Sequence, residues 1–173
     1  MIWATHSTHL WPGADEKYKP IAIKAGALGR GLPFVELVVS PQHHVLIRNE
    51  LCQEMFGHAE VLAPAKGLTE MVGVRWMRGK KEATYFHLLL AKHALLRANG
   101  AQSESFYPGP TGVAMLSAAQ RETLFDVLPA LRSDPDNGYG PTVRAKITRR
   151  QAEKLVAEMA KVRGDARQPE YAA

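Results

Sequence analysis

The sequence is poor in cysteine and in long apolar runs. Its 173 residues contain one cysteine, Cys52, which excludes an intramolecular disulfide framework and a cysteine-rich zinc site. No apolar run approaches the ~20 residues that a helix needs to cross a bilayer. The N-terminus lacks a basic region followed by an apolar stretch, so it does not resemble a secretory signal. We therefore expect a cytoplasmic protein with no membrane partner.

Several motifs with a known mechanism are also missing. The sequence has no Gly-x-Ser-x-Gly elbow, no His-Glu-x-x-His pair and no EF-hand loop. The glycine-rich stretch from Gly26 to Pro33 lacks the Gly-Lys-Ser/Thr ending of a phosphate cradle, and turns at positive φ explain it better. His6 and His9 have no evident further ligand, which favours solvent-exposed histidines. We expect no metal, no cofactor and no small-molecule substrate.

Basic charge is concentrated at the C-terminal end. The net charge is +5, but residues 1–140 hold 14 basic and 13 acidic side chains, whereas residues 141–173 hold 8 and 4. A nearly neutral body with a basic appendage argues against a protein that binds nucleic acid over its whole surface.

Short apolar runs separated by turn-forming residues fill the first 110 residues. The expected strands are Ile21–Ala25, Val35–Val39, Val45–Arg48, Val61–Ala63, Val72–Met77, Thr84–Leu90 and Leu95–Ala98. Many short strands at close spacing predict a mostly β module. Strand and helix do not alternate, which argues against a Rossmann-type sheet.

Two helices are expected after the β region. Ser117 and Gln120 form a potential capping box for a helix over about 117–131, with Pro129 ending or kinking it. The turn-rich residues 134–147 read as a linker. Residues 148–173 then form an amphipathic basic helix with a frayed tail from about Asp165, so the expected division is 1–133, 134–147 and 148–173.

One cluster that could carry chemistry is Ser40-Pro41-Gln42-His43, followed by His44. Proline keeps Ser40 extended, and the turn can bring a hydroxyl and an imidazole together at a strand end. Such a pair can polarise a carbonyl and protonate a leaving amine. The alternative is an ordinary turn with surface histidines.

A second cluster runs from Thr84 to Gly100. Two apolar strands flank Lys92 and end at Asn99-Gly100, which is a strong turn signal. His87 and His93 share a strand face only if the strand is unbroken. On the pattern alone, both are ordinary strand residues.

Taken in order, five segments resemble the bacterial Hint (Hedgehog/intein) domain proteins over roughly the first 130 residues. They are Pro20–Gly29, Leu37–Leu46, Glu60–Leu68, Tyr85–His93 and Ser103–Phe106. The resemblance implies a compact, mostly β horseshoe fold. It also implies self-cleavage or splicing, in which a first-position Cys or Ser attacks the preceding carbonyl and forms a (thio)ester.

The resemblance also implies site residues. Ser40 and His43 match the element that assists the acyl shift, and His93 looks like the late histidine that promotes the C-terminal step. His87 is a secondary candidate. Ala91 stands where an acidic residue is expected, and no His-Asn ending follows Gly100.

The segment that carries the first-position nucleophile is not matched, and Cys52 lies in the wrong place to replace it. Without a nucleophile the assisting groups have nothing to activate. We therefore expect an incomplete or degenerate autoprocessing module, inactive alone, whose partner is an N-terminal Hint segment supplied in cis or in trans.

Two alternatives stay open. The basic C-terminal helix could bind nucleic acid or an acidic partner, although a solvated helix packed on the β body is favoured. A hydrolase using Ser40 with His43 or His44 would need an orienting acid, and Glu36 is the nearest in sequence.

Overall fold

A computed structural model describes residues 1–10 and 19–165 and contains three antiparallel sheets. The strands are β1 (Trp3–Leu10), β2 (Ile21–Ile23), β3 (Leu37–Val39), β4 (His44–Arg48), β5 (Glu60–Pro64), β6 (Val74–Trp76), β7 (Glu82–Leu89), β8 (Leu95–Ala98) and β9 (Ala101–Glu104). They pair as β1–β7, β3–β2–β6 and β5–β4–β9–β8. The predicted mostly β module followed by helices is confirmed.

The larger hydrophobic core lies between the three-stranded and four-stranded sheets. All three residues of β2 are fully buried, as are Val45 on β4 and Val61 on β5. Burial on both faces explains why β2 and β5 read as continuous apolar runs, whereas β4 alternates between buried and part-exposed residues. Each buried aliphatic side chain contributes about 1.5–3 kcal/mol relative to exposure, so this core holds the two sheets together.

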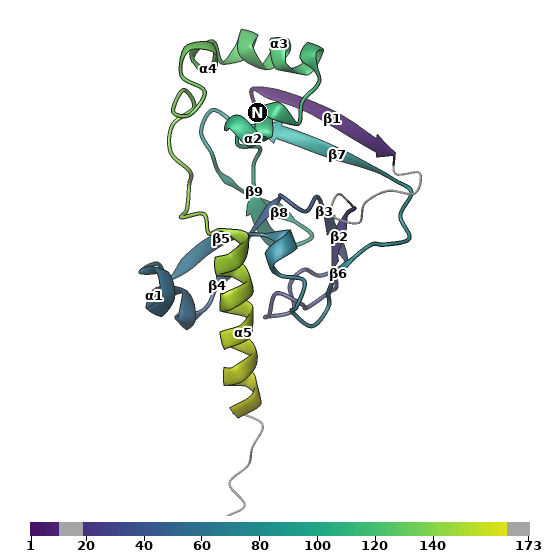
Figure 1. The fold of residues 1–173 in the computed structure, drawn as a ribbon, viewed down its shortest axis with the longest axis vertical. Coiled ribbons are helices and arrows are strands. Elements are labelled where there is room, and N and C mark those ends of the chain that lie inside the picture. Colours follow the sequence, from purple (N-terminus) through teal and green to yellow (C-terminus); the bar gives the residue numbers. More distant parts are fainter. Residues whose placement is uncertain (11–18, 166–173) are drawn as a thin grey trace, which may run out of the picture.

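Strands β1 and β7 form a separate ribbon over eight residue pairs, from Trp3 opposite Leu89 to Leu10 opposite Glu82. Trp3 and Leu89 pack in a second core with Leu124 and Leu131. Figure 1 shows this ribbon beside α2, α3 and α4, at the opposite end of the molecule from α5. The sequence did not predict β1, because its Thr, His and Ser residues leave few apolar positions.

The helices depart from expectation in number and length. They are α1 (Glu50–Phe56), the 3-10 turn η2 (Ala65–Gly67), α2 (Pro110–Ala114), α3 (Ala118–Val127), α4 (Ala130–Ser133) and α5 (Arg149–Asp165). The capping box of Ser117 and Gln120 is confirmed. Pro129 separates α3 from α4, as expected of a residue without an amide proton. Helices α1 and α2 were not predicted.

The chain between α4 and α5 returns to the four-stranded sheet. Leu62 of β5 donates its N–H to Ala145 O at 2.8 Å and accepts from Ile147 N at 2.9 Å. Thr148 and Gln151 then cap α5 reciprocally.

Helix α5 covers the larger core with its apolar face. Ala152, Leu155 and Val156 are buried there. The predicted frayed tail begins at about Asp165, and residues 166–173 lie outside the described part of the chain. Among the helices in the described ranges, none has the length and apolarity to cross a bilayer.

The seven predicted strands all exist, with shifted ends. The strand expected from Val35 begins at Leu37, and the strand expected from Val72 begins at Val74. Val35 and Val72 are 59% and 86% exposed, so an apolar side chain alone did not mark the strand start. The glycine-rich stretch from Gly26 was predicted to form turns at positive φ, and Gly26 has a φ of 76°.

Candidate functional site

A tight turn links β3 to β4 and places Ser40 and His43 at one end of the four-stranded sheet. His43 donates its N–H to Ser40 O at 3.1 Å. Pro41 O and His43 O accept hydrogen bonds from Lys66 N and Ala65 N. The predicted turn therefore exists, and η2 holds it against the body of the protein.

Burial decides the protonation state of the His43 imidazole. Removal from water lowers the pKa of His43 from 6.5 to about 4; Glu104 opposes this shift, whereas the neighbouring His44, His87 and Lys146 reinforce it. His43 is therefore neutral near pH 7. A neutral imidazole can accept one proton and return it, which is the requirement for a general base that then acts as an acid.

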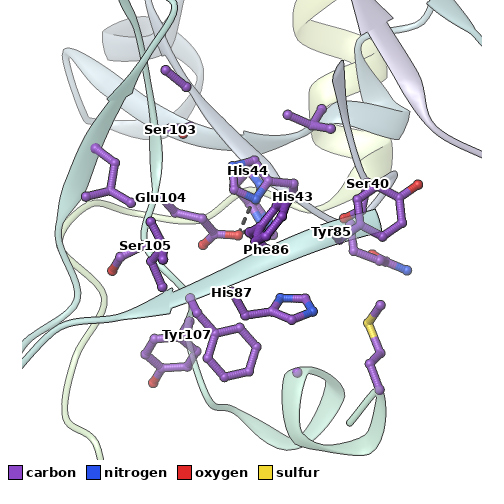
Figure 2. Close-up of a pocket in the computed structure, with 18 of the residues that line it drawn as sticks. Ser40, His43, His44, Tyr85, Phe86, His87, Ser103, Glu104, Ser105 and Tyr107 are labelled. Atoms are coloured by element: carbon purple, nitrogen blue, oxygen red, sulfur yellow. Dashed lines mark hydrogen bonds and ion pairs between the residues drawn. The ribbon is translucent and has the colours of Figure 1, made fainter. Parts of the chain in front are cut away.

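Glu104, at the end of β9, is a buried carboxylate surrounded by donors. Its Oε1 accepts from His44 Nδ1 at 2.7 Å and from His44 N at 3.0 Å. Its Oε2 lies 3.0 Å from Lys146 Nζ and 3.4 Å from His93 Nε2. Figure 2 shows His44 directed at Glu104, beside His43.

The charge of Glu104 is held by these neighbours. Burial alone would raise the pKa of Glu104, but the hydrogen bond from His44, the nearby His93 and the charge of Lys146 hold this pKa well below its usual range. Because the carboxylate is ionised, it can only accept, and His44 carries a proton on Nδ1. Glu104 thus fixes the orientation of the His44 ring, as the acid of a catalytic triad does.

His93 lies behind the carboxylate, with a side chain that is fully buried. Its Nδ1 accepts a hydrogen bond from Val143 N at 3.0 Å, and its ring meets Tyr107 edge-on at 5.2 Å. His93 does not line the cleft that Ser40, His43 and His44 border. His93 therefore reaches that cleft only through Glu104.

His87 lies on β7 and faces the same hollow as His43 (Figure 2). Its Nε2 is 3.3 Å from Ser7 Oγ, and its ring lies 5.2 Å from that of Phe106. Burial and the charge of His9 lower the pKa of His87. The strand ends at Leu89, so His87 and His93 do not share one strand face.

These side chains border a cleft of about 630 Å³ between the ribbon and the four-stranded sheet. Ser40, His43, His44, His87 and Glu104 all line it. The volume is in the range of ligand pockets and admits a peptide segment. Of the residues predicted for the site, Ser40, His43 and His87 share the cleft, whereas His93 stands behind it.

Cys52 is remote from this cleft. It is fully buried in the larger core, and its Sγ contacts Ile47 O at 3.8 Å. Burial raises the pKa of the Cys52 thiol, which disfavours the reactive thiolate. Cys52 is therefore a core side chain in this fold.

Within residues 1–10 and 19–165, no group of three His, Cys, Asp or Glu side chains is arranged to hold a metal ion. His6 is exposed, and its ring packs against Phe86 at 6.0 Å. His9 packs against Tyr85 at 5.5 Å.

Sequence reasoning missed the role of Glu104 and Lys146 and treated Glu36 as the nearest acid. Glu36 instead forms an exposed ion pair with Arg75 at 3.0 Å. Glu104 could have been suspected only as a charged residue inside the Ser103–Phe106 segment that carries the family resemblance. No local sequence pattern indicated a role for Lys146, because it lies 42 residues from Glu104 in the chain.

The fold and the cleft define a mostly β domain with imidazoles and a hydroxyl gathered at a strand end. The family model of the Hint domain matches residues 2–110. The chain therefore belongs to the Hint domain family, whose members are autoprocessing domains. Searches of curated proteins and of solved structures found no match.

Proposed function

We propose that this chain supplies the acid–base groups of a Hint-type acyl-transfer site, and that a Cys or Ser nucleophile is delivered to the cleft by another segment, in cis or in trans. The observation that carries the proposal is the neutral, partly buried His43 in a cleft that it shares with Ser40 and His87. No Cys lines this cleft among the described residues. The chain alone is then inactive in self-cleavage.

In the proposed step, His43 takes the proton from the incoming thiol or hydroxyl. The sulfur or oxygen attacks the preceding carbonyl carbon, forming a (thio)ester bond as the carbon–nitrogen bond breaks. His43 then gives its proton to the departing amine. Ser40 lies at the other end of the turn from His43 and also lines the cleft, where its hydroxyl can donate a hydrogen bond to the carbonyl oxygen.

His44 and Glu104 support this step electrostatically. The buried carboxylate orients the His44 ring beside His43 and balances positive charge that develops when His43 binds a proton. His93 contributes from behind the cleft, through the same carboxylate. The proposed role of His93 is therefore positioning rather than direct proton transfer.

The contacts of the basic helix α5 do not favour a role in binding nucleic acid or an acidic partner. The apolar face of α5 covers the larger core. Two of its basic side chains pair with acids of the same helix, Arg149 with Glu153 and Lys161 with Glu158. These contacts favour a solvated helix that packs on the β body.

The test is a fusion of a reporter domain, the opening segment of an active Hint domain beginning with Cys, and residues 1–173. We expect the reporter to be released, and faster with an added thiol that attacks the thioester. His43→Ala should slow release about 100-fold, the typical contribution of a general base. His93→Ala should slow release less, because His93 acts through Glu104.

The matched control is His58→Ala, since His58 is exposed and is not among the cleft-lining residues. This variant should release the reporter at the wild-type rate. An intact wild-type fusion, or unchanged release in His43→Ala, would contradict the proposal.

A further inference from the structure

The family match ends at residue 110, yet two groups of the site come from the segment 143–147 between α4 and α5. Val143 donates its N–H to His93 Nδ1 at 3.0 Å. Lys146 places its ammonium 3.0 Å from Glu104 Oε2. We call residues 143–147 the strap. The strap contacts both the carboxylate of Glu104 and the buried imidazole of His93, and its Lys146 also lines the cleft.

The strap is fixed in place along its length. Arg144 Nε lies 2.5 Å from Glu60 Oε1. Ala145 and Ile147 make backbone hydrogen bonds to Leu62, and Ile147 is 5% exposed in the larger core. The positions of Val143 and Lys146 are therefore set by the sheet and the core, as a pre-organised site requires.

The hydrogen bond from Val143 decides the tautomer of His93. A backbone N–H can only donate, so His93 Nδ1 must be the acceptor and the ring proton lies on Nε2. Nε2 is the atom that faces Glu104, at 3.4 Å. The strap thus turns the N–H of His93 toward the carboxylate, where the opposite tautomer would present a lone pair to a negative charge.

Lys146 decides the charge around the carboxylate. Its side chain is 28% exposed, and its ammonium also lies 5.3 Å from the centre of the Tyr107 ring. It is one of the charges that lower the pKa of both Glu104 and His43. The groups that act on His43 are Glu104, His44, His87 and Lys146, so Lys146 is the one permanent cation among them.

We infer that the strap is a positioning element of the acyl-transfer site, in which Lys146 and the Val143 N–H hold Glu104, His44 and His93 in the arrangement that serves the cleft. The inference rests on the proposed function for its effect on rate, but its geometry can be tested without any cleavage. It predicts that this site depends on sequence beyond the matched Hint domain.

The first test measures the imidazole nitrogens of His93 in the intact chain by ¹⁵N NMR. We expect the proton on Nε2 and a bare Nδ1. A proton on Nδ1 would overturn the role of Val143, whether or not the reporter fusion cleaves.

The second test compares Lys146→Met, Lys146→Arg and Lys154→Met. Lys146→Met should raise the pKa of His43, measured by NMR titration. It should also slow reporter release about tenfold, because Glu104 and His44 lose the cation that holds them in place. Lys146→Arg keeps the cation and should restore both values. Lys154 is exposed on α5, and Lys154→Met should match wild type.

The two proposals fail in different ways. If the wild-type fusion does not cleave while the pKa of His43 still rises in Lys146→Met, the proposed function fails and the strap stands. If the fusion cleaves but Lys146→Met leaves the pKa of His43 and the release rate unchanged, the strap fails. Thermal unfolding of each variant shows that a folded protein is compared.

Discussion

The two sides of the site surround their histidines differently. On the cleft side, burial lowers the pKa of His43 and His87, so their rings are neutral and line an open hollow. On the inner side, His93 is fully buried and faces the carboxylate of Glu104. His44 joins the two sides, because it lines the cleft and is hydrogen-bonded to Glu104.

This difference separates proton transfer from charge balance. A general base must meet the reacting group, and only the cleft side offers a ring to an incoming peptide. Close hydrogen-bond donors stabilise the charge of a buried carboxylate more than that of an exposed one, because the protein interior screens charge weakly. The chain therefore combines cleft imidazoles that can exchange a proton with a carboxylate whose charge is held by close donors.

The largest expected effect comes from removing the inner charge. Glu104→Gln leaves the His44 and Lys146 donors without their carboxylate, and breaking a buried pair in this way costs about 3 kcal/mol of unfolding free energy. Chemical denaturation measures the loss. The matched variant Glu36→Gln breaks an exposed pair with Arg75 and should cost less than about 1 kcal/mol. Equal losses in the two variants would contradict the comparison.

A smaller effect is expected from the cleft side and appears as a pH dependence. Between pH 6.5 and about 4, the unfolded chain binds a proton at His43 that the folded chain does not bind. The unfolding free energy therefore falls as the pH drops through this window. The lowered pKa of Glu104 adds a further fall below its ordinary value of 4.5, since the unfolded chain protonates first.

His43→Gln should flatten the upper part of this dependence and leave the part below pH 4.5. Gln42→Ala, which changes an exposed neighbour without a titrating group, should keep the full slope. Denaturant unfolding at closely spaced pH values measures both. If the unfolding free energy had the same slope above pH 4.5 in His43→Gln and wild type, His43 would not be the source of this pH dependence.

Local features of the site and fold were predictable from the sequence. The turn from Ser40 to His43 is marked by a proline after an apolar strand, and the capping box of Ser117 with Gln120 is a contiguous signal. Both are confirmed. Such features depend on neighbouring residues, so their physical cause is visible in a short window of sequence.

Features that depend on distant contacts were not predictable in the same way. Lys146 reaches Glu104 because the strap pairs with Leu62 of β5, far away in the chain. Strand β1 exists because β7 pairs with it over its whole length and Trp3 reaches the second core. Neither contact produces a periodic apolar pattern in the sequence. Most residues of β1 are polar, and the strap has the composition of a linker.

The most direct measurement is an NMR pH titration of the seven histidines, with His43 assigned by comparison with His43→Gln. We expect His43 to stay neutral down to a midpoint near pH 4, which leaves a free base in the cleft at neutral pH. A His43 midpoint at the ordinary value of 6.5 would contradict this expectation, because the ring would then be solvated and the cleft would not control its proton.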